Sequence, residues 1–213
     1  MKRYRLVFAF LLSTLTLTSF AQENTQWHHY NFNVGGGVTP MVGADTSRLN
    51  TGWNFVAGGG YNFTHALGIV GEYMVNQSGV SDRVLRQLNV PGGSGTIWSL
   101  TANPTLRINP SGRFGGYLIG GGGLYTRTVQ FTQPTTAAVD FFDPFFGFGT
   151  AFVPADQVIG SVTRHAAGWN AGGGLTFGLG SMGAKLYTEA RYHWADTAGR
   201  PIQIVPVTIG LRW

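Results

Sequence analysis

Seven charged or titratable side chains occupy alternate positions within segments whose other residues are mostly apolar. A segment with this period of two is typical of a β-strand that turns one face toward the interior of a closed sheet. Charges enclosed in a narrow interior need partners, because burying an unpaired charge costs several kcal/mol. The pattern predicts a salt-bridge network that fills the interior. The alternative is a gate, in which exchange of partners around Glu72 or Glu189 opens a narrow path. The seven residues are Glu72, Arg107, Lys185, Glu189, Arg191, His193 and Arg212.

Two groups of residues contain the side-chain types of a catalytic site. His193 is near Asp196, and Ser161 is near His165 and Asp156. Acid–base or nucleophilic chemistry requires hydrogen-bond geometry between such groups, which closeness in sequence does not establish. We therefore expect no catalytic site and no cofactor, with a lipid-modifying enzyme as an alternative. No spacing of His, Asp and Glu resembles a set of metal ligands, so we expect no metal.

Runs of glycine recur at 35–37, 58–60, 120–123 and 172–174. A phosphate-binding loop needs Gly-Lys-Ser/Thr after its glycines, and none of the four runs has it. Glycine within a strand instead relieves crowding where a sheet curves tightly, and it leaves room for a large side chain opposite. The glycine runs therefore favour a small, strongly curved sheet over a nucleotide site.

Eight segments between about residue 28 and residue 213 alternate apolar and polar residues. Residues 184–194 give the clearest case, with Leu186 and Trp194 on one face and Glu189 and Arg191 on the other. The connections near 64–66, 109–112 and 179–183 are short. Those near 43–50, 77–95, 133–160 and 195–201 are longer. Short turns at one end and long loops at the other are typical of a membrane barrel. The sequence predicts an all-β fold, an eight-stranded antiparallel up-and-down transmembrane β-barrel spanning residues 22–213.

Aromatic residues fall at two levels of this predicted barrel. With the first strand running outward, one set lies near the loop end and comprises Trp53, Trp98, Trp169 and Trp194. The other set lies near the turn end and comprises Tyr30, Phe32, Phe63, Phe177 and Trp213. Aromatic girdles at both membrane interfaces are a property of transmembrane barrels. We therefore expect these residues to contact lipid.

The last strand carries apolar residues on one face and ends on an aromatic residue. That face comprises Val205, Val207, Ile209, Leu211 and Trp213. The pattern resembles the C-terminal signature of bacterial outer-membrane barrels, and the whole chain resembles the small eight-stranded barrels of the OmpA and OmpX type. The resemblance implies that the barrel-assembly machinery reads this strand, and it implies contact with outer-membrane lipid.

Composition and the N-terminal segment agree with an exported protein. Charged residues are only 11% of the chain, against about a quarter in soluble domains, and there is no cysteine. Residues 1–21 combine Lys2, Arg3 and Arg5 with an apolar stretch and a Ser19-Phe20-Ala21 cleavage site, which predicts a signal peptide cleaved after Ala21. Without these three basic residues the formal charge of +5 falls to about +2, so nucleic acid is not an expected partner.

The connection over 133–160 is rich in phenylalanine. Exposed phenylalanines at this density favour either packing within the loop or contact with lipid, a host surface or an extracellular protein partner. We expect a bacterial outer-membrane protein with a structural or surface-interaction role, such as adhesion, and no catalysis. A narrow, porin-like pore for ions or small solutes, gated by the interior charges, is the first alternative. The loop residues are Phe141, Phe142, Phe145, Phe146, Phe148 and Phe152.

Overall fold

A computed structural model describes residues 28–110, 112–180, 183–196 and 201–213. The predicted signal peptide over 1–21 lies outside the described residues, as do residues 197–200 of the last long connection. Among the described residues, no helix combines the length and hydropathy that a membrane-spanning helix requires.

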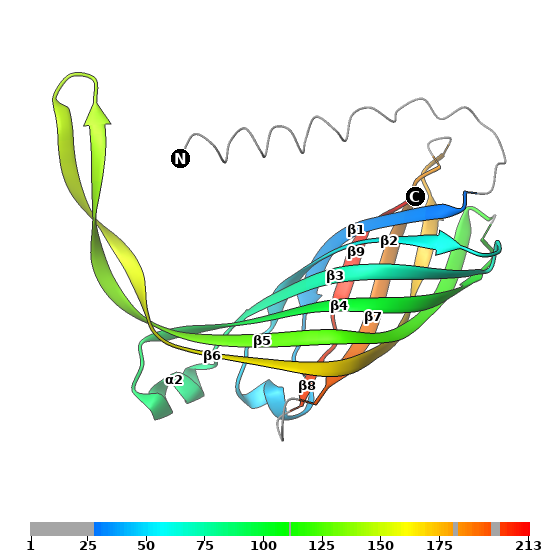
Figure 1. The fold of residues 1–213 in the computed structure, drawn as a ribbon, viewed down its shortest axis with the longest axis horizontal. Helices are drawn as coiled ribbons and strands as arrows, with labels where there is room; N and C mark the ends of the chain where they lie inside the picture. Colours follow the sequence, from blue (N-terminus) through cyan, green and yellow to red (C-terminus); the bar gives the residue numbers. More distant parts are fainter. Residues whose placement is uncertain (1–27, 111, 181–182, 197–200) are drawn as a thin grey trace.

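The strands form one antiparallel sheet that closes on itself (Figure 1). β6 pairs with β7, and β9 pairs with both β7 and β1, so the sheet becomes a ring of eight positions. This confirms the predicted eight-stranded antiparallel barrel. The strands are β1 (Tyr30–Thr39), β2 (Gly52–Asn62), β3 (Leu67–Gly79), β4 (Gly92–Ile108), β5 (Phe114–Asp143), β6 (Gly147–Gly178), β7 (Lys185–Ala195), β8 (Ile202–Ile204) and β9 (Val207–Arg212).

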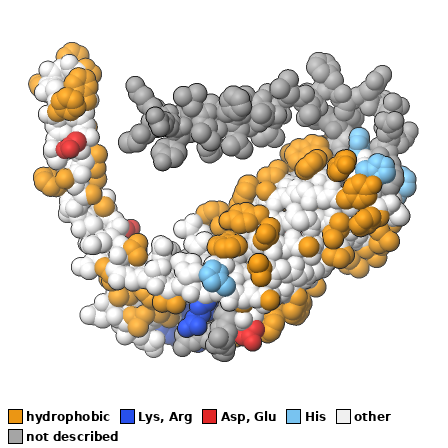
Figure 2. All heavy atoms as spheres, viewed as in Figure 1, with side chains coloured by type: hydrophobic (Ala, Val, Ile, Leu, Met, Phe, Trp, Pro, Cys, Tyr) orange, Lys and Arg blue, Asp and Glu red, His pale blue; other side chains and the backbone are white. Residues whose placement is uncertain are grey.

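Side chains along the strands alternate between the outside and the inside of the ring. In β1, Tyr30 and Phe32 are exposed, whereas Asn31 and Asn33 are buried. Apolar side chains cover much of the visible outer wall (Figure 2). In a soluble sheet the apolar face would be the buried one, so this inverted pattern fits a barrel that meets lipid on the outside.

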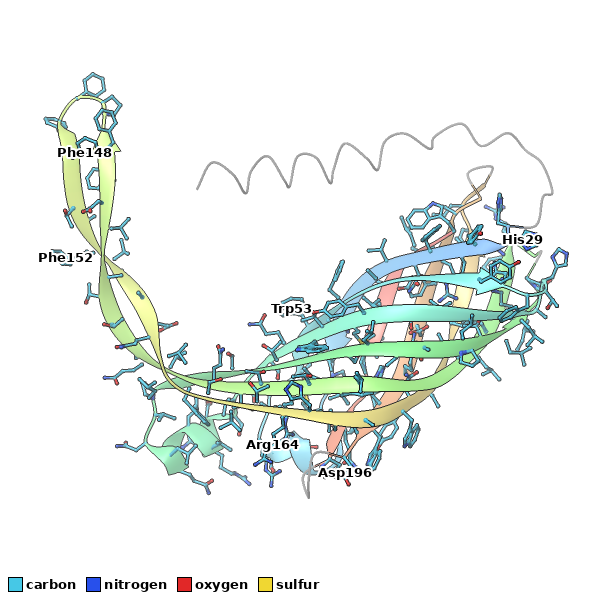
Figure 3. The ribbon with its side chains drawn as sticks, in the orientation of Figure 1. His29, Trp53, Phe148, Phe152, Arg164 and Asp196 are labelled. Atoms are coloured by element: carbon cyan, nitrogen blue, oxygen red, sulfur yellow. The ribbon has the colours of Figure 1, made fainter. Side chains whose placement is uncertain are left out.

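Aromatic residues lie at both ends of the outer wall. Trp169 and Trp194 are opposite each other on β6 and β7, with ring centroids 6.4 Å apart. At the turn end, Phe114 and Phe177 are likewise opposite, with ring centroids 4.8 Å apart. Trp53 lies on the outer wall near the loop end, as Figure 3 shows. Their contact with lipid stays a prediction.

The eighth position of the ring is divided between β8 and β9, whereas the sequence predicts one strand from Val205 to Trp213 after a connection near 195–201. β8 ends at Ile204 and β9 begins at Val207. Pro206 has no N–H to donate, so the regular ladder is interrupted there, although its carbonyl oxygen still accepts a hydrogen bond from the backbone N–H of Arg191 at 3.2 Å. The backbone N–H of Val205 instead donates to the carbonyl oxygen of Pro40, just beyond the end of β1, at 3.2 Å.

Two of the predicted long connections contain regular structure. The first includes a short 3-10 helix, η1 (Gly43–Ser47). The second is shorter than the predicted 77–95, because β3 continues to Gly79 and β4 begins at Gly92; between them lies α2 (Asp82–Leu88).

The third predicted loop, 133–160, is not a loop. β5 and β6 continue pairing from the barrel wall to the Asp143↔Gly147 pair, with one register irregularity at Phe131/Thr132. The prolines and glycines of this stretch indicated a loop, but the two strands pair through them. The resulting β5–β6 hairpin leaves the barrel and turns to one side of it (Figure 1).

Candidate functional site

Arg191 on β7 lies between two glutamates in the middle of the barrel interior. Its Nη1 donates to Glu72 Oε2 at 2.6 Å, and its Nε donates to Glu189 Oε1 at 2.9 Å. Its Nη2 also pairs with Glu189 Oε1. Arg191 and Glu72 are each 2% exposed, and Glu189 is 4% exposed. The structure therefore brings these three predicted residues together as a buried ion triad.

Neutral side chains also donate hydrogen bonds to the carboxylate oxygens of the triad. Asn33 Nδ2 donates to Glu72 Oε1 at 2.8 Å, and Asn103 Nδ2 donates to Glu72 Oε2 at 2.7 Å. Tyr117 Oη donates to Glu189 Oε2 at 2.8 Å. A buried charge group stabilises a fold only when its remaining lone pairs are satisfied in this way. The neutral donors come from β1, β4 and β5, so the triad connects strands around the ring.

Arg212 of β9 balances the charge of the triad. Its Nη2 lies 4.0 Å from Glu189 Oε2. The guanidinium carbon is 4.2 Å from the ring centroid of Tyr117 and 5.1 Å from that of Tyr187, both within range of a cation–π interaction. Two glutamates and two arginines thus leave the central interior formally neutral.

The remaining predicted interior residues do not pair directly with either glutamate in the part of the chain that the structure describes. His193 is buried, and its Nδ1 is 3.0 Å from Tyr125 Oη rather than next to a carboxylate. Arg107 pairs with the side-chain oxygen of Asn62 toward the turn end. Lys185 Nζ donates to the carbonyl oxygen of Pro110 at 2.5 Å, also toward the turn end. These three side chains are not members of the central network.

Interior glycines make room for the tyrosines of the network. A Cβ atom at Gly174 would lie 2.6 Å from Tyr117 Oη, and one at Gly35 would lie 2.5 Å from Tyr187 Oη. Real Cβ contacts are not this short, so a side chain at either position would displace a tyrosine. This explains why a barrel of eight strands can hold large aromatic side chains in an interior that side chains already fill.

An apolar cluster lies inside the loop end of the barrel. Sequence analysis missed it, because several members lie outside regular alternation. Isolated bridges hold two of its parts in place, Met41 with Ile204 and Leu49 with Val80. An apolar constriction of this kind opposes the passage of water and ions. The buried members, called the loop-end plug below, are Met41, Leu49, Val80, Ile97, Tyr125, Ala195, Ile202 and Ile204.

The groups considered for catalysis are not assembled. Ser161 and His165 are four residues apart on extended β6, about 13 Å along the strand. His165 Nδ1 instead lies 2.7 Å from Thr126 Oγ1. Asp156 is on the hairpin opposite Pro134, and Asp196 is exposed while His193 is buried. No group of three or more potential metal ligands occurs within the part of the chain that the structure describes.

The end of the β5–β6 hairpin carries the six predicted phenylalanines; residues 141–152 are called the hairpin tip below. Phe145 is 89% exposed and Phe146 is 90% exposed. Phe142 and Phe148 are opposite each other, with ring centroids 5.2 Å apart. Figure 3 shows Phe148 and Phe152 on the outlying part of the hairpin, away from the barrel wall. The tip is therefore a largely exposed apolar surface.

A closed antiparallel ring with an apolar exterior and an ion-paired interior defines a small transmembrane β-barrel. The structure is similar to Ail, the attachment invasion locus protein of Yersinia pestis, solved in complex with the heparin analogue sucrose octasulfate (17% identity, TM-score 0.53, 87% of this chain and 100% of that chain). It is also similar to Neisserial surface protein A, NspA (13% identity, TM-score 0.53, 87% of this chain and 96% of that chain). At these identities the likeness shows the fold: that of small outer-membrane barrels.

No protein-family model matches the sequence, and no curated protein matches it.

Proposed function

We propose that this protein is an outer-membrane surface protein in which a sealed barrel carries the β5–β6 hairpin as its interaction element. The observation that carries the proposal is the contrast between the two parts of the molecule. The interior is filled by paired charges and an apolar plug, whereas the hairpin tip presents six phenylalanines that are between 47% and 90% exposed. Exposed apolar clusters of this kind mark interaction sites.

Placement in the outer membrane is part of the same proposal. It is supported by the fold shared with outer-membrane barrels and by the apolar outer wall. The predicted signal peptide and the apolar face of the last strand are consistent with export and with assembly by the barrel-assembly machinery. The short turns then face the periplasm, and the hairpin lies on the cell surface.

The similarity to Ail agrees with a surface role, because that protein is named for attachment and was solved with a heparin analogue. An identity of 17% does not carry the ligand over to this chain. A site that binds a polyanion needs basic side chains. Residues 133–160 of the hairpin contain three aspartates and no lysine, arginine or histidine. We therefore assign the interaction role to the apolar tip.

A pore is disfavoured by two barriers in series. An ion crossing the barrel would first have to separate Arg191 from Glu72 and Glu189, which are joined by direct hydrogen bonds. It would then have to cross the loop-end plug, where apolar side chains offer no replacement for water of hydration. No observation among the described residues favours the gated pore over a sealed interior.

The purified protein is accordingly expected to produce no discrete conductance steps in a planar lipid bilayer. The measurement is current recording at fixed voltage, with a known porin inserted under the same conditions as the positive control. Heat-dependent mobility on a detergent gel, measured on the same preparation, establishes that the barrel is folded. Reproducible unitary steps from folded protein would contradict the sealed interior.

If the hairpin is the interaction element, we expect its tip to be covered by a bound partner or surface on the living cell. The chain has no cysteine, so single-cysteine variants can be labelled cleanly. With a membrane-impermeant maleimide on intact cells, Phe146→Cys is expected to react about tenfold more slowly than Thr135→Cys, equivalent to about 1.4 kcal/mol of engagement. Thr135 is the matched control because it is exposed on the same hairpin but lies outside the tip. Equal reaction rates would overturn the interaction role.

A further inference from the structure

We propose that the hairpin tip binds the lipid surface of the membrane that holds the barrel. This inference rests on the proposed role of the hairpin as the interaction element, and it names the partner. The tip then acts as a second, interfacial anchor at a distance from the barrel wall.

The phenylalanines surround the tip instead of forming one flat face. In the β5–β6 register, Phe142 is opposite Phe148 and Ala138 is opposite Phe152, which places these three rings on one face of the hairpin. Phe141 is opposite Gly149 and is on the other face. Phe145 and Phe146 lie in the connecting turn. A flat protein surface can cover only one face, whereas a fluid lipid phase can accept apolar groups on all sides.

The residue types of the tip also favour lipid over a protein partner. Residues that dominate protein–protein binding are most often Trp, Tyr and Arg, which combine contact area with hydrogen bonding. The stretch from 137 to 153 contains none of the three, and its large side chains are all phenylalanine except for two valines. Phenylalanine has no polar group, so its burial depends on an apolar environment alone.

The backbone of the hairpin limits insertion to the membrane interface. Pairing of β5 with β4 ends at the Gly92↔Thr132 pair, and pairing of β6 with β7 ends at Gly168, so both outer edges of the tip lack a strand partner among the described residues. Unpaired backbone groups are not tolerated in the hydrocarbon core. Interfacial segments lie only about 5–10 Å deep, where water and lipid headgroups remain available to hydrogen-bond such groups.

Asp140 indicates the same depth. Its carboxylate accepts a hydrogen bond from Thr150 Oγ1 at 2.7 Å and is three residues from the end of β5. At about 3.3 Å per residue, this carboxylate lies about 10 Å from the turn. Asp140 can remain among lipid headgroups at that level, and Asp143 at the end of β5 limits the phenylalanines of the turn to the boundary between headgroups and acyl chains.

The direction of the hairpin brings it over the membrane. In Figure 1 the hairpin does not continue along the barrel but turns to one side of it, and Figure 2 shows apolar side chains gathered at its end. A surface hairpin that extends sideways from a barrel has the surrounding lipid as its nearest surface. A hairpin that continued straight outward along the barrel would instead extend away from that lipid.

The test uses the full-length protein with an environment-sensitive NBD fluorophore on Phe146→Cys, reconstituted in phosphatidylcholine vesicles with no other protein. Emission at this position is expected to shift to shorter wavelength relative to the same protein in detergent. It is also expected to lose most of its intensity when the vesicles contain lipid with a nitroxide near the headgroup. NBD on Thr135→Cys should show neither change. Adding Phe145→Asp to the labelled protein should abolish the shift without altering heat-dependent mobility, because residue 145 is exposed in the turn between β5 and β6, outside the barrel wall.

The outcomes separate the possible partners. If NBD at position 146 in vesicles shows the same emission wavelength and quenching as NBD at position 135, lipid binding is wrong. If the tip is nevertheless protected from maleimide on intact cells, the interaction role stands and its partner is a protein. A shift that disappears when the protein is diluted to one barrel per vesicle overturns lipid binding in favour of contact between two copies of the chain. If Phe146→Cys is not protected from maleimide on intact cells and its NBD emission does not shift in vesicles, both the interaction role of the hairpin and its binding to lipid are wrong.

Discussion

Replacing Arg191 by methionine is expected to lower the free energy of unfolding of the barrel by about 3–5 kcal/mol. Arg191 is the shared partner of Glu72 and Glu189, and all three side chains are buried. Without the guanidinium, the interior holds two carboxylates and only Arg212 to balance them, which leaves one uncompensated buried charge. The measurement is urea-induced unfolding in lipid vesicles, followed by tryptophan fluorescence.

The double variant Glu72→Gln/Arg191→Met is the control for this charge effect. It removes one negative and one positive charge, so that Glu189 keeps Arg212, whose Nη2 is 4.0 Å from its Oε2. If charge imbalance causes the loss, the double variant recovers a substantial part of the stability that the single variant loses. A double variant that is no more stable than Arg191→Met would show that packing of the arginine stem, rather than its charge, supports the interior.

The strand pattern shows how far the sequence predicts this interior and where it stops. Period-two alternation was sufficient to assign Glu72, Glu189 and Arg191 to one side of the sheet, because a strand residue has only two faces to occupy. It did not identify which charges pair. That depends on the relative stagger of strands that are distant in sequence, such as β3 and β7, and the stagger is set by closure of the whole ring.

The same limitation explains why Arg107 and Lys185 were grouped with the triad. Both belong to strands whose other charged or polar residues point inward, but they lie at the turn end. There they reach Asn62 and the Pro110 carbonyl instead of a carboxylate. Facing inward is a property of one strand, whereas height along the barrel is a property of the assembled sheet.

The loop-end plug could not be predicted from alternation. Met41 and Leu49 lie in the connection between β1 and β2, where no regular period exists. Ile202 and Ile204 are buried inside the barrel, but they precede the strand predicted from Val205, so alternation assigned them to neither face. Near the end of a barrel the lipid no longer surrounds the wall, so an apolar residue there is more stable inside, against other apolar residues.

The length of the β5–β6 hairpin was missed for a related reason. Prolines and glycines between 133 and 160 are the usual signals of a loop. Pro134 and Pro154 are nevertheless accommodated in β5 and β6, opposite Asp156 and Thr136. Because neither edge of the hairpin pairs with another strand among the described residues, a proline can occupy a position whose missing N–H would point away from the partner strand. Signals that exclude a central strand do not exclude a lone hairpin.

Replacing Gly37 by alanine is expected to destabilise the barrel by about 1–3 kcal/mol, the usual cost of overpacking. Gly37 is on β1 opposite Thr208 of β9, in the seam that closes the ring. A Cβ atom there would lie 1.9 Å from the carbonyl oxygen of Val207, and backbone cannot move aside as the end of a side chain can. The two strands must therefore separate or shift, which weakens the ladder on which closure depends. Urea unfolding in lipid vesicles measures the effect.

Gly71→Ala provides the matched control. Gly71 is also a strand glycine, but it faces outward, and a Cβ atom at this position would meet its nearest neighbour at 3.7 Å, an ordinary contact. Alanine is more favourable than glycine within a strand by about 0.5–1 kcal/mol, so this variant is expected to be as stable as the original protein or slightly more stable. Equal destabilisation by the two variants would mean that loss of glycine flexibility, rather than crowding in the seam, sets the cost. A loss confined to Gly37→Ala would show that the cost comes from the contact of the added Cβ atom with the backbone of Val207.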